Sequence, residues 1–108
     1  AAIHQGVVYL GGQVPEQSRG ADIAAQTAEV LALIDALLRD AGSDKHHLLM
    51  VTIYLADLAD YAGMNTVWDA WVSAHAAPPR ACVQAQLADP AWRIEMVLTA
   101  AQCEILTN

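Results

Sequence analysis

Residues 22–42 read DIAAQTAEVLALIDALLRDAG and carry the clearest helical pattern in the chain. Seven side chains recur at spacings of three and four residues, which places them on one face of a helix. They are Ile23, Thr27, Val30, Ile34, Leu37, Leu38 and Ala41. Asp22 is a suitable N-cap, and Gly42 can take the left-handed conformation that ends a helix. We therefore predict a helix over residues 22–41 that buries one of its sides.

Upstream of this helix, the sequence predicts a short hairpin followed by a loop. Residues 1–4 and 7–10 have the pattern of two strands around a tight turn at residues 5–6. Gly11-Gly12 interrupts that pattern, so we expect the second strand to end there. Residues 13–20 contain proline, serine and glycine and are expected to form the loop that leads into the helix.

Downstream of the helix, residues 49–55 read LMVTIYL, a β-branched run that is typical of a buried strand. A second helix is expected to begin at Asp57 or Asp60 and to run to about His75. Pro78-Pro79 would end it, because proline lacks the backbone N–H and restricts the residue before it.

The last part of the chain alternates between apolar and polar side chains. Residues 80–87 and 92–101 each show this period of two, and a turn around Asp89-Pro90 lies between them, which predicts a β-hairpin. The order of elements is then β-β-α-β-α-β-β in a single domain covering residues 1–108. We expect an α+β fold of two layers, with the helices packed on one face of a mixed sheet.

The composition limits the functions that such a domain can have. Hydrophobic residues make up 56% of the 108 residues and charged residues 16%, with a mean hydropathy of +0.29, so a disordered chain is excluded. Twelve acidic and five basic side chains give a net charge of −7, which disfavours a nucleic-acid partner. The apolar excess in so short a chain favours an oligomer that buries part of a sheet face.

Metal sites and membrane segments have no signature in the sequence. Cys82 and Cys103 lack CxxC spacing, and the four histidines are scattered, so we expect no metal site and reduced thiols. No stretch reaches the roughly 18 apolar residues of a membrane span. The N-terminal residues have no signal-peptide pattern and no initial Met, so we expect a cytoplasmic protein whose N-terminus has been trimmed.

Arg80 is the candidate anion-binding residue. It follows two prolines at the start of an apolar strand, and the prolines restrict the approach of the chain. The planar guanidinium group has five donors and binds a carboxylate in a bidentate manner. A structural salt bridge to one of the twelve acids would explain Arg80 equally well.

Further candidates have competing structural explanations. Glu95 is either an exposed residue paired with Arg93 or a partly buried acid, whose raised pKa would let it orient or deprotonate a water. Gly12 lies where a ligand could approach the backbone closely, although a plain turn explains it as well. Three aromatic residues could line a pocket, but their helical spacing favours packing, and one asparagine is expected to act as a local cap. The aromatic residues are Tyr61, Trp68 and Trp71, and the asparagine is Asn65.

Seven segments in order along the chain resemble the Rid family (RidA/YjgF), the reactive intermediate deaminases. They are VYLGGQVP at 8–15, DIAAQT at 22–27, AGS at 41–43, TIYLAD at 52–57, MNTVW at 64–68, PPRACV at 78–83 and IEM at 94–96. The resemblance implies a chorismate-mutase-like α+β fold. It also implies a homotrimer whose sheets pack into a central barrel, with three ligand sites at the subunit interfaces.

The same resemblance implies an activity that requires no cofactor. Typical members hydrolyse 2-imino or enamine acids, such as 2-aminoacrylate, to 2-oxo acids and ammonia. The family arginine that binds the substrate carboxylate corresponds to Arg80, and the glutamate that positions the attacking water corresponds to Glu95. The glycine whose backbone faces the ligand corresponds to Gly12, and Cys82 corresponds to a cysteine near the site. The partner would be a small metabolite that carries a carboxylate.

Some positions depart from the family pattern. Gly11 stands where many members have a hydroxyl residue, Ala81 stands where many have serine, and the tyrosine-bearing N-terminal segment is either missing or trimmed. These departures motivate an alternative, a non-catalytic module that binds a small carboxylate or 2-oxo acid at Arg80. RNA cleavage, which is sometimes attached to this family, is disfavoured by the charge of −7.

Overall fold

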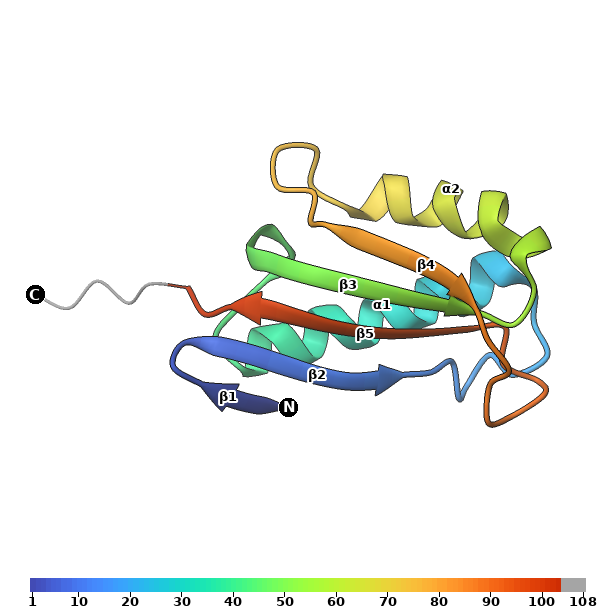
Figure 1. Cartoon of the computed structure of the whole chain (residues 1–108), viewed down its shortest axis with the longest axis horizontal. Coiled ribbons are helices and arrows are strands. Elements are labelled where there is room, and N and C mark those ends of the chain that lie inside the picture. Colours follow the sequence, from blue (N-terminus) through green and yellow to red (C-terminus); the bar gives the residue numbers. More distant parts are fainter. Residues whose placement is uncertain (104–108) are drawn as a thin grey trace, which may run out of the picture.

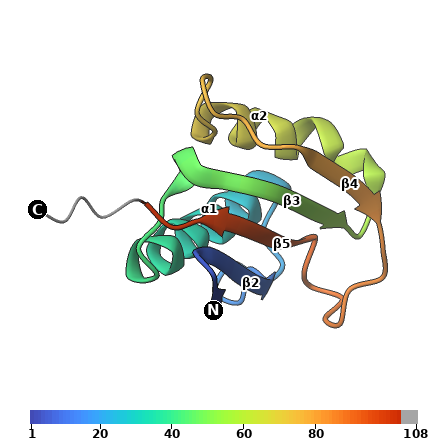
Figure 2. The ribbon, with the colours of Figure 1, turned by 60° about the vertical axis from the view of Figure 1, so that its left-hand side comes forward.

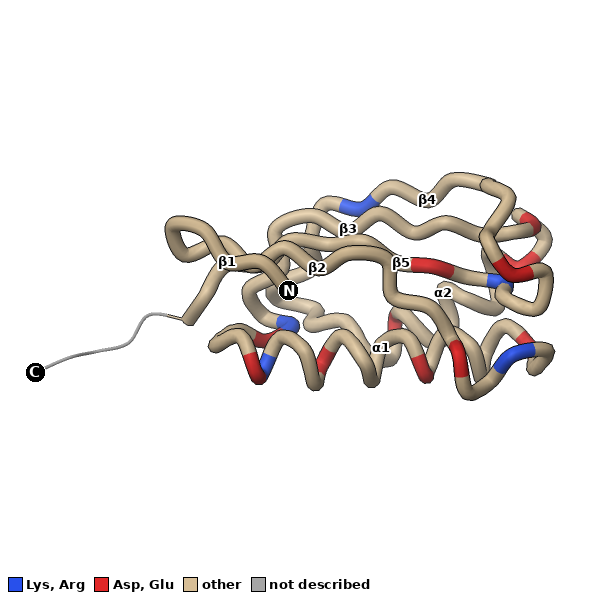
Figure 3. Tube along the Cα trace, turned by 90° about the horizontal axis from the view of Figure 1, so that it is seen from below, with Lys and Arg blue, Asp and Glu red and all other residues tan. Residues whose placement is uncertain are grey.

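The computed structural model describes residues 1–103, which form a five-stranded sheet with two helices packed against it (Figure 1). The predicted two-layer α+β fold is therefore confirmed, and Figure 3 shows the strands and the helices as separate layers. The strands are β1 (Ala2–His4), β2 (Val7–Gln13), β3 (Leu48–Leu55), β4 (Arg80–Gln84) and β5 (Ile94–Ala101). The helices are α1 (Ile23–Asp40) and α2 (Tyr61–Trp71), and two 3₁₀ turns are η1 (Lys45–His47) and η2 (Leu58–Asp60).

The order of strands across the sheet is β1-β2-β5-β3-β4. The last four of these strands are labelled in Figure 2. β5 pairs antiparallel with both β2 and β3, whereas β4 runs parallel to β3 at the edge. The predicted hairpin between residues 80–87 and 92–101 is therefore wrong, because β3 lies between these two strands. The segment β3-α2-β4 is a strand–helix–strand unit, and such a crossover places its two strands side by side and parallel.

Two predicted element boundaries are also wrong. β2 continues through Gly11-Gly12 to Gln13, and its register against β5 shifts between Leu10 and Gln13, which marks a β-bulge. α2 ends at Trp71 rather than near His75, since Val72 already has an extended backbone with ψ of 145°. Past this point the side chains are small, polar or exposed, so a longer helix would bury little apolar surface.

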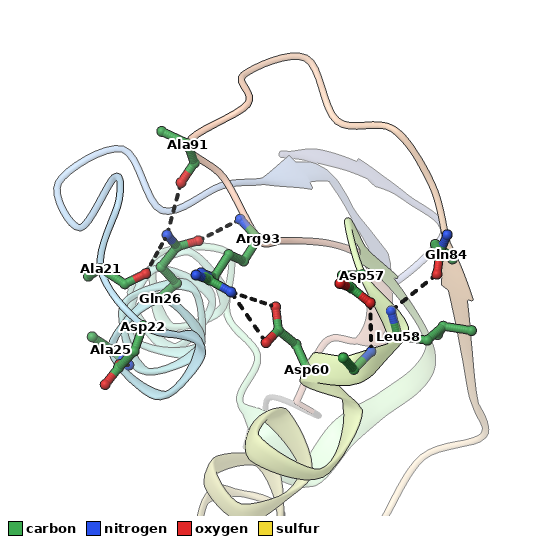
Figure 4. Close-up of polar contacts among 11 residues, drawn as sticks. Ala21, Asp22, Ala25, Gln26, Asp57, Leu58, Asp60, Gln84, Ala91 and Arg93 are labelled. Carbon is green, nitrogen blue, oxygen red and sulfur yellow. Dashed lines mark hydrogen bonds and ion pairs between the residues drawn. The ribbon is translucent and has the colours of Figure 1, made fainter.

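Helix α1 forms as predicted, including both of its ends. The Asp22 side chain accepts a hydrogen bond from the backbone N–H of Ala25 at 2.9 Å, and Gly42 has a φ of +79°. The buried Gln26 on this helix donates to the carbonyls of Ala21 and Ala91 and accepts from the N–H of Arg93 (Figure 4). One side chain thus fastens the start of α1 to the connection between β4 and β5.

The sheet has one buried face and one largely uncovered face. Six fully buried or almost fully buried side chains of β3 and β5 point toward the helices: Val51, Ile53, Leu55, Ile94, Met96 and Leu98. The opposite face includes Tyr9, Met50 and Val83, which are 45%, 40% and 42% exposed. Charged residues lie mostly on the helices and loops (Figure 3), so this outer face of the sheet is mainly apolar. Neither helix within residues 1–103 has the length and apolar character needed to span a bilayer.

Candidate functional site

Arg80 is the first residue of β4, at the edge of the sheet. Its register partner on β3 is Val51, whose fully buried side chain points toward the helices, so the side chain of Arg80 leaves the sheet on the same face. The backbone N–H of Val51 donates to the carbonyl of Pro79 at 3.1 Å. Pairing with β3 therefore begins one residue before Arg80 and fixes the point from which its side chain extends.

The guanidinium group of Arg80 is held by three side chains of α2. Nη1 donates to Oδ1 of Asn65 at 2.7 Å, and Nη2 donates to the hydroxyl of Tyr61 at 3.3 Å. Its carbon lies 5.2 Å from the ring centroid of Trp68 and 5.9 Å from that of Tyr61, which is within cation–π range. The expectation that Asn65 acts only as a local cap is wrong, since its side chain binds the guanidinium instead.

Arg80 forms no ion pair with an acidic residue within residues 1–103, and the same holds for Arg39 on α1, whereas the other two arginines are paired. Arg19 forms an ion pair with Asp89 at 2.8 Å, and Arg93 forms one with Asp60 at 3.2 Å (Figure 4 shows the second). Within residues 1–103, no carboxylate lies within ion-pair distance of Arg80, so the salt-bridge explanation of this residue is wrong for the chain described. Its neighbours orient the positive charge without neutralising it.

A cavity of about 510 Å³ lies beside this guanidinium and is lined by Leu58, Tyr61, Arg80 and Cys82. Cys82 pairs with Ile53 and therefore lies on the same face as Arg80. Burial raises the pKa of the Cys82 thiol, while the positive charge of Arg80 acts in the opposite direction. With the net shift upward, Cys82 is a neutral and polarisable wall of the cavity rather than an activated nucleophile.

The three aromatic residues of α2 divide between cavity and packing. Tyr61 lines the cavity, whereas Trp68 is 5% exposed and belongs to the core. Trp71 packs against Trp68 with the ring planes tilted by 48° and the centroids 5.5 Å apart, and its Nε1 donates to Asp35 on α1. The preference for packing is thus confirmed for the two tryptophans only.

Glu95 and Gly12 lie on the other face of the sheet and against each other. Glu95 pairs with Tyr54 and lies between Ile94 and Met96, which are buried under the helices. Because side chains alternate along a strand, the side chain of Glu95 points away from the helices. A Cβ atom added to Gly12 would lie only 2.5 Å from Oε2 of Glu95 and 2.9 Å from its Cδ. Gly12 sits at the bulge of β2, and its missing side chain leaves the space that the carboxylate occupies.

Of the two alternatives for Glu95, the pairing with Arg93 is wrong. Arg93 binds Asp60, and no residue within 1–103 donates a hydrogen bond to the half-buried carboxylate of Glu95. The sequence-predicted residues therefore form two groups. Arg80 and Cys82 project from the helix face of the sheet, and Glu95 and Gly12 project from the opposite face.

The connection between β4 and β5 forms a second cavity, next to the end of β4. Its volume is about 550 Å³, and residues 84–90 line it together with Ala56 and Trp92. The Gln84 side chain at its edge accepts from the backbone N–H of Leu58 at 3.2 Å (Figure 4). This contact ties the end of β4 to the η2 turn, whose Leu58 also lines the Arg80 cavity.

Comparisons with known proteins agree on one family. The model described as Endoribonuclease L-PSP matches residues 1–102. A RutC family protein of Haemophilus ducreyi is 48% identical over 101 residues, covering 93% of this chain and 85% of the relative. The crystal structure of NMB1025, a YjgF family member from Neisseria meningitidis, superposes with a TM-score of 0.89 at 52% identity, covering 93% of this chain and 82% of that one. YyfA of Yersinia pestis, described as a Rid family protein of unknown function, superposes with a TM-score of 0.82 at 25% identity over 92% of this chain and 82% of its own.

Proposed function

The chain belongs to the YjgF/Rid family, and from that premise we propose that it hydrolyses small 2-imino or enamine acids to 2-oxo acids and ammonia. The observation that carries this proposal is the guanidinium of Arg80, which is oriented by neutral neighbours beside a cavity and has no acidic partner within residues 1–103. A substrate of the 2-aminoacrylate class carries the carboxylate that such a group binds.

Arg80 would serve as the carboxylate anchor. Its contacts with Asn65 and Tyr61 engage one N–H of each terminal nitrogen, and a guanidinium has five N–H groups, so donors remain for a substrate. Hydrogen bonds that involve a charged group contribute about 1.5–3 kcal/mol each, and a bidentate pair also fixes the orientation of the bound acid. Anchoring the carboxylate places the adjacent imine carbon at a defined position.

Glu95 would act on the water that attacks this carbon. The carbon of a protonated imine is already electrophilic, so the reaction depends mainly on positioning a water. Water adds to the C=N bond, and Glu95 accepts the proton that the water loses. Return of that proton to nitrogen lets ammonia leave as the C=O bond forms, so imino acid and water give oxo acid and ammonia. None of these steps requires a cofactor.

The two groups of residues would meet between subunits. Because Arg80 and Glu95 project from opposite faces of one sheet, we propose that Arg80 and Cys82 of one chain face Glu95 and Gly12 of a neighbouring chain. The exposed apolar side chains of the uncovered sheet face supply surface for such an assembly. A homotrimer is the assembly that the family resemblance implies.

A binding module without catalysis is the second candidate, and the departures at Gly11 and Ala81 favour it. A Cβ atom on Gly11 would meet nothing within 4 Å, so packing does not require a glycine there. The absence of a hydroxyl group at this position is therefore a difference in site chemistry rather than in fold. Such a module would bind a 2-oxo acid at Arg80 and release it unchanged.

The decisive assay generates 2-aminoacrylate in situ and follows the release of the 2-oxo acid. The proposal expects the wild-type chain to exceed the rate in buffer and Arg80→Ala to fall back to it. A wild-type rate equal to buffer, or an Arg80→Ala rate equal to wild type, would contradict it. Calorimetry with 2-oxobutyrate separates the alternatives, since binding without turnover supports the module and an absence of binding contradicts the module.

Nucleic acid is not a proposed partner, although the description of the family model contains the word endoribonuclease. The net charge of −7 disfavours contact with a phosphate backbone, and a cytoplasmic location stays a prediction. An RNA affinity that falls steeply with salt would contradict this exclusion.

A further inference from the structure

Asp44, His47 and Cys103 come together where β5 ends and β3 begins, outside the two groups of site residues described above. Nδ1 of His47 lies 2.7 Å from Oδ1 of Asp44 and 3.6 Å from Sγ of Cys103. The Sγ atom lies 3.7 Å from Oδ2 of the same aspartate. A nitrogen, an oxygen and a sulfur atom from distant parts of the chain therefore surround one point, and all lie within 4.8 Å of one another.

The backbone fixes both arms of this cluster. Asp44 caps the η1 turn, because its Oδ1 accepts from the N–H of His46 at 2.9 Å. Cys103 donates its backbone N–H to the carbonyl of Gly42 at 2.8 Å, and the side chain of Gln102 donates to the carbonyl of Ala41 at 2.9 Å. The Asp44 side chain and the backbone that carries Cys103 are therefore placed by contacts that do not depend on a ligand.

A cysteine, a histidine and an aspartate could also form a nucleophile with its general base. In that arrangement one ring nitrogen of histidine faces the nucleophile and the other faces the carboxylate. Here the thiol and the carboxylate both approach Nδ1 of His47. One nitrogen cannot donate a proton to Asp44 and also accept one from Cys103, so the geometry is unsuited to a relay.

We propose that Asp44, His47 and Cys103 form a binding site for Zn²⁺, with water as the fourth ligand. Tetrahedral zinc has Zn–N and Zn–S distances of about 2.0–2.1 and 2.3 Å, which place its nitrogen and sulfur ligands about 3.6 Å apart. The observed separations of Sγ from Nδ1 and from Oδ2 are 3.6 and 3.7 Å, close to these values. The mixture of thiolate, imidazole and carboxylate suits zinc rather than Mg²⁺ or Ca²⁺, which prefer oxygen ligands alone.

The charges around the cluster favour a divalent cation. Binding releases the thiol proton of Cys103 to solvent, and the thiolate and Asp44 then balance the charge of the ion. The neighbouring Lys45 turns its ammonium group toward the ring of Trp71, 5.5 Å from the centroid. The proposal departs from the expectation of no metal site, which rested on local spacing, because only the folded chain brings residues 44–47 next to Cys103.

The test uses the full chain, stripped of metal with a chelator and titrated with Zn²⁺ and with Co²⁺ as a spectroscopic probe. We expect one ion per chain, the intense visible bands of tetrahedral Co²⁺, and a thiolate-to-cobalt charge-transfer band in the near ultraviolet. Cys103→Ser should abolish the charge-transfer band. It should also weaken zinc binding by more than the roughly 10–100-fold that loss of a second-shell partner causes. Asp44→Asn should weaken binding while keeping the cap, since asparagine is an equally good N-cap.

Two matched controls decide whether the signal belongs to this cluster. Cys82→Ser removes the other cysteine, and His46→Ala removes the histidine next to His47, so both should keep the cobalt spectrum and the zinc affinity. Circular dichroism of each variant shows that the fold is retained. The proposal is overturned if the wild-type chain gives no charge-transfer band, if Cys103→Ser retains it, or if His46→Ala loses zinc as completely as His47→Ala.

Discussion

The environments of Arg80 and Glu95 differ in how completely one chain builds them. Arg80 is held by Tyr61, Asn65 and Trp68 of α2, so its guanidinium has a fixed position within the chain. Glu95 lies on the uncovered face of the sheet, against the backbone of Gly12, and receives no hydrogen bond from any residue within 1–103. The surroundings of Arg80 are therefore built within one chain, whereas the proposal has a neighbouring chain complete those of Glu95.

This difference separates two kinds of mutational effect. Changes around Arg80 disturb contacts that also join β4 to α2, so they should alter the packing as well as the proposed ligand binding. Changes around Glu95 affect a carboxylate on an open surface and should alter function with little effect on stability.

Removal of the guanidinium should have the largest effect on activity. Arg80→Ala removes a bidentate, charge-assisted pair of hydrogen bonds worth about 3–5 kcal/mol, so kcat/KM for an imino acid should fall by roughly 10²–10⁴-fold. Steady-state kinetics on 2-aminoacrylate measures this loss. Arg80→Lys keeps the positive charge but not the planar, forked guanidinium, so its kcat/KM should lie between those of the wild type and Arg80→Ala. Wild-type kinetics in the lysine variant would show that the fork has no role.

Adding one methyl group beside Glu95 should reduce activity while sparing the fold. The Cβ of Gly12→Ala would lie 2.5 Å from Oε2 of Glu95, and the flexible end of the glutamate can move away to relieve the contact. We expect kcat to fall by about 10–100-fold, because displacing Glu95 removes part of the roughly 10²–10⁴-fold that general acid–base catalysis typically contributes. The free energy of unfolding should change by less than about 1 kcal/mol.

Gly11→Ala is the matched control for this prediction. A Cβ at Gly11 meets nothing within 4 Å, so this variant should keep both the activity and the unfolding transition of the wild type. Denaturant titration and the oxo-acid assay are run on both variants. Equal kcat in the two alanine variants would contradict the role given to the space beside Gly12.

Loosening the support of Arg80 should have a smaller effect, mainly on substrate binding. Asn65→Ala removes the 2.7 Å hydrogen bond that orients Nη1 but leaves the guanidinium in place, so only part of the bond energy is lost to substrate binding and KM should rise about 5–10-fold with kcat less affected. Tyr61→Phe removes a longer bond of 3.3 Å and keeps the aromatic ring, so its KM should change less. The opposite ranking of the two variants would show that the tyrosine, not the asparagine, orients the guanidinium.

The loop after β2 gives the smallest expected effect, a dependence of stability on pH. Desolvation raises the pKa of Glu29, but hydrogen bonds from the hydroxyl of Ser18 and from the backbone of Gln17 and Ser18 lower it by more. A lowered pKa in the folded state stabilises the fold above the ordinary glutamate value of about 4.3, and this contribution disappears as the pH falls through the lowered value.

Glu29→Gln should therefore lower the denaturant midpoint slightly at neutral pH and have no such effect in strongly acidic solution. Urea titrations at both pH values measure the difference. A loss of stability that is the same at both values would show that the charge of Glu29 does not hold the loop.

The sequence predicts where the helices lie and which side of a strand is buried better than it predicts which strands lie next to each other in the sheet. Helix α1 and its cap at Asp22 follow from spacing and local hydrogen bonding, and the buried side of β5 follows from alternation. Alternation along β4 does not show which strand lies beside it, because that depends on the crossover through α2. The hairpin predicted there was wrong for this reason.

The candidate site could be predicted in part. The residues themselves pointed to Arg80, Glu95 and Gly12, and the family resemblance gave these residues roles and added Cys82, but neither led to the residues that support Arg80. Tyr61, Asn65 and Trp68 are spaced by four and three residues, which places them on one face of α2, and this signal was available in the sequence. The division of the site between two faces required the register of β4 against β3, which local patterns do not contain.

The most direct test of the account mixes two inactive variants. The Arg80→Ala chain keeps Glu95, and the Glu95→Gln chain keeps Arg80. If each site is shared between two chains, a complete site forms wherever a chain with Arg80 lies next to a chain with Glu95. Equal amounts, unfolded and refolded together, should recover about a quarter of wild-type activity, since half of the chains carry each intact group. Activity no higher than that of the two variants measured separately would contradict the claim that each site is formed by two chains.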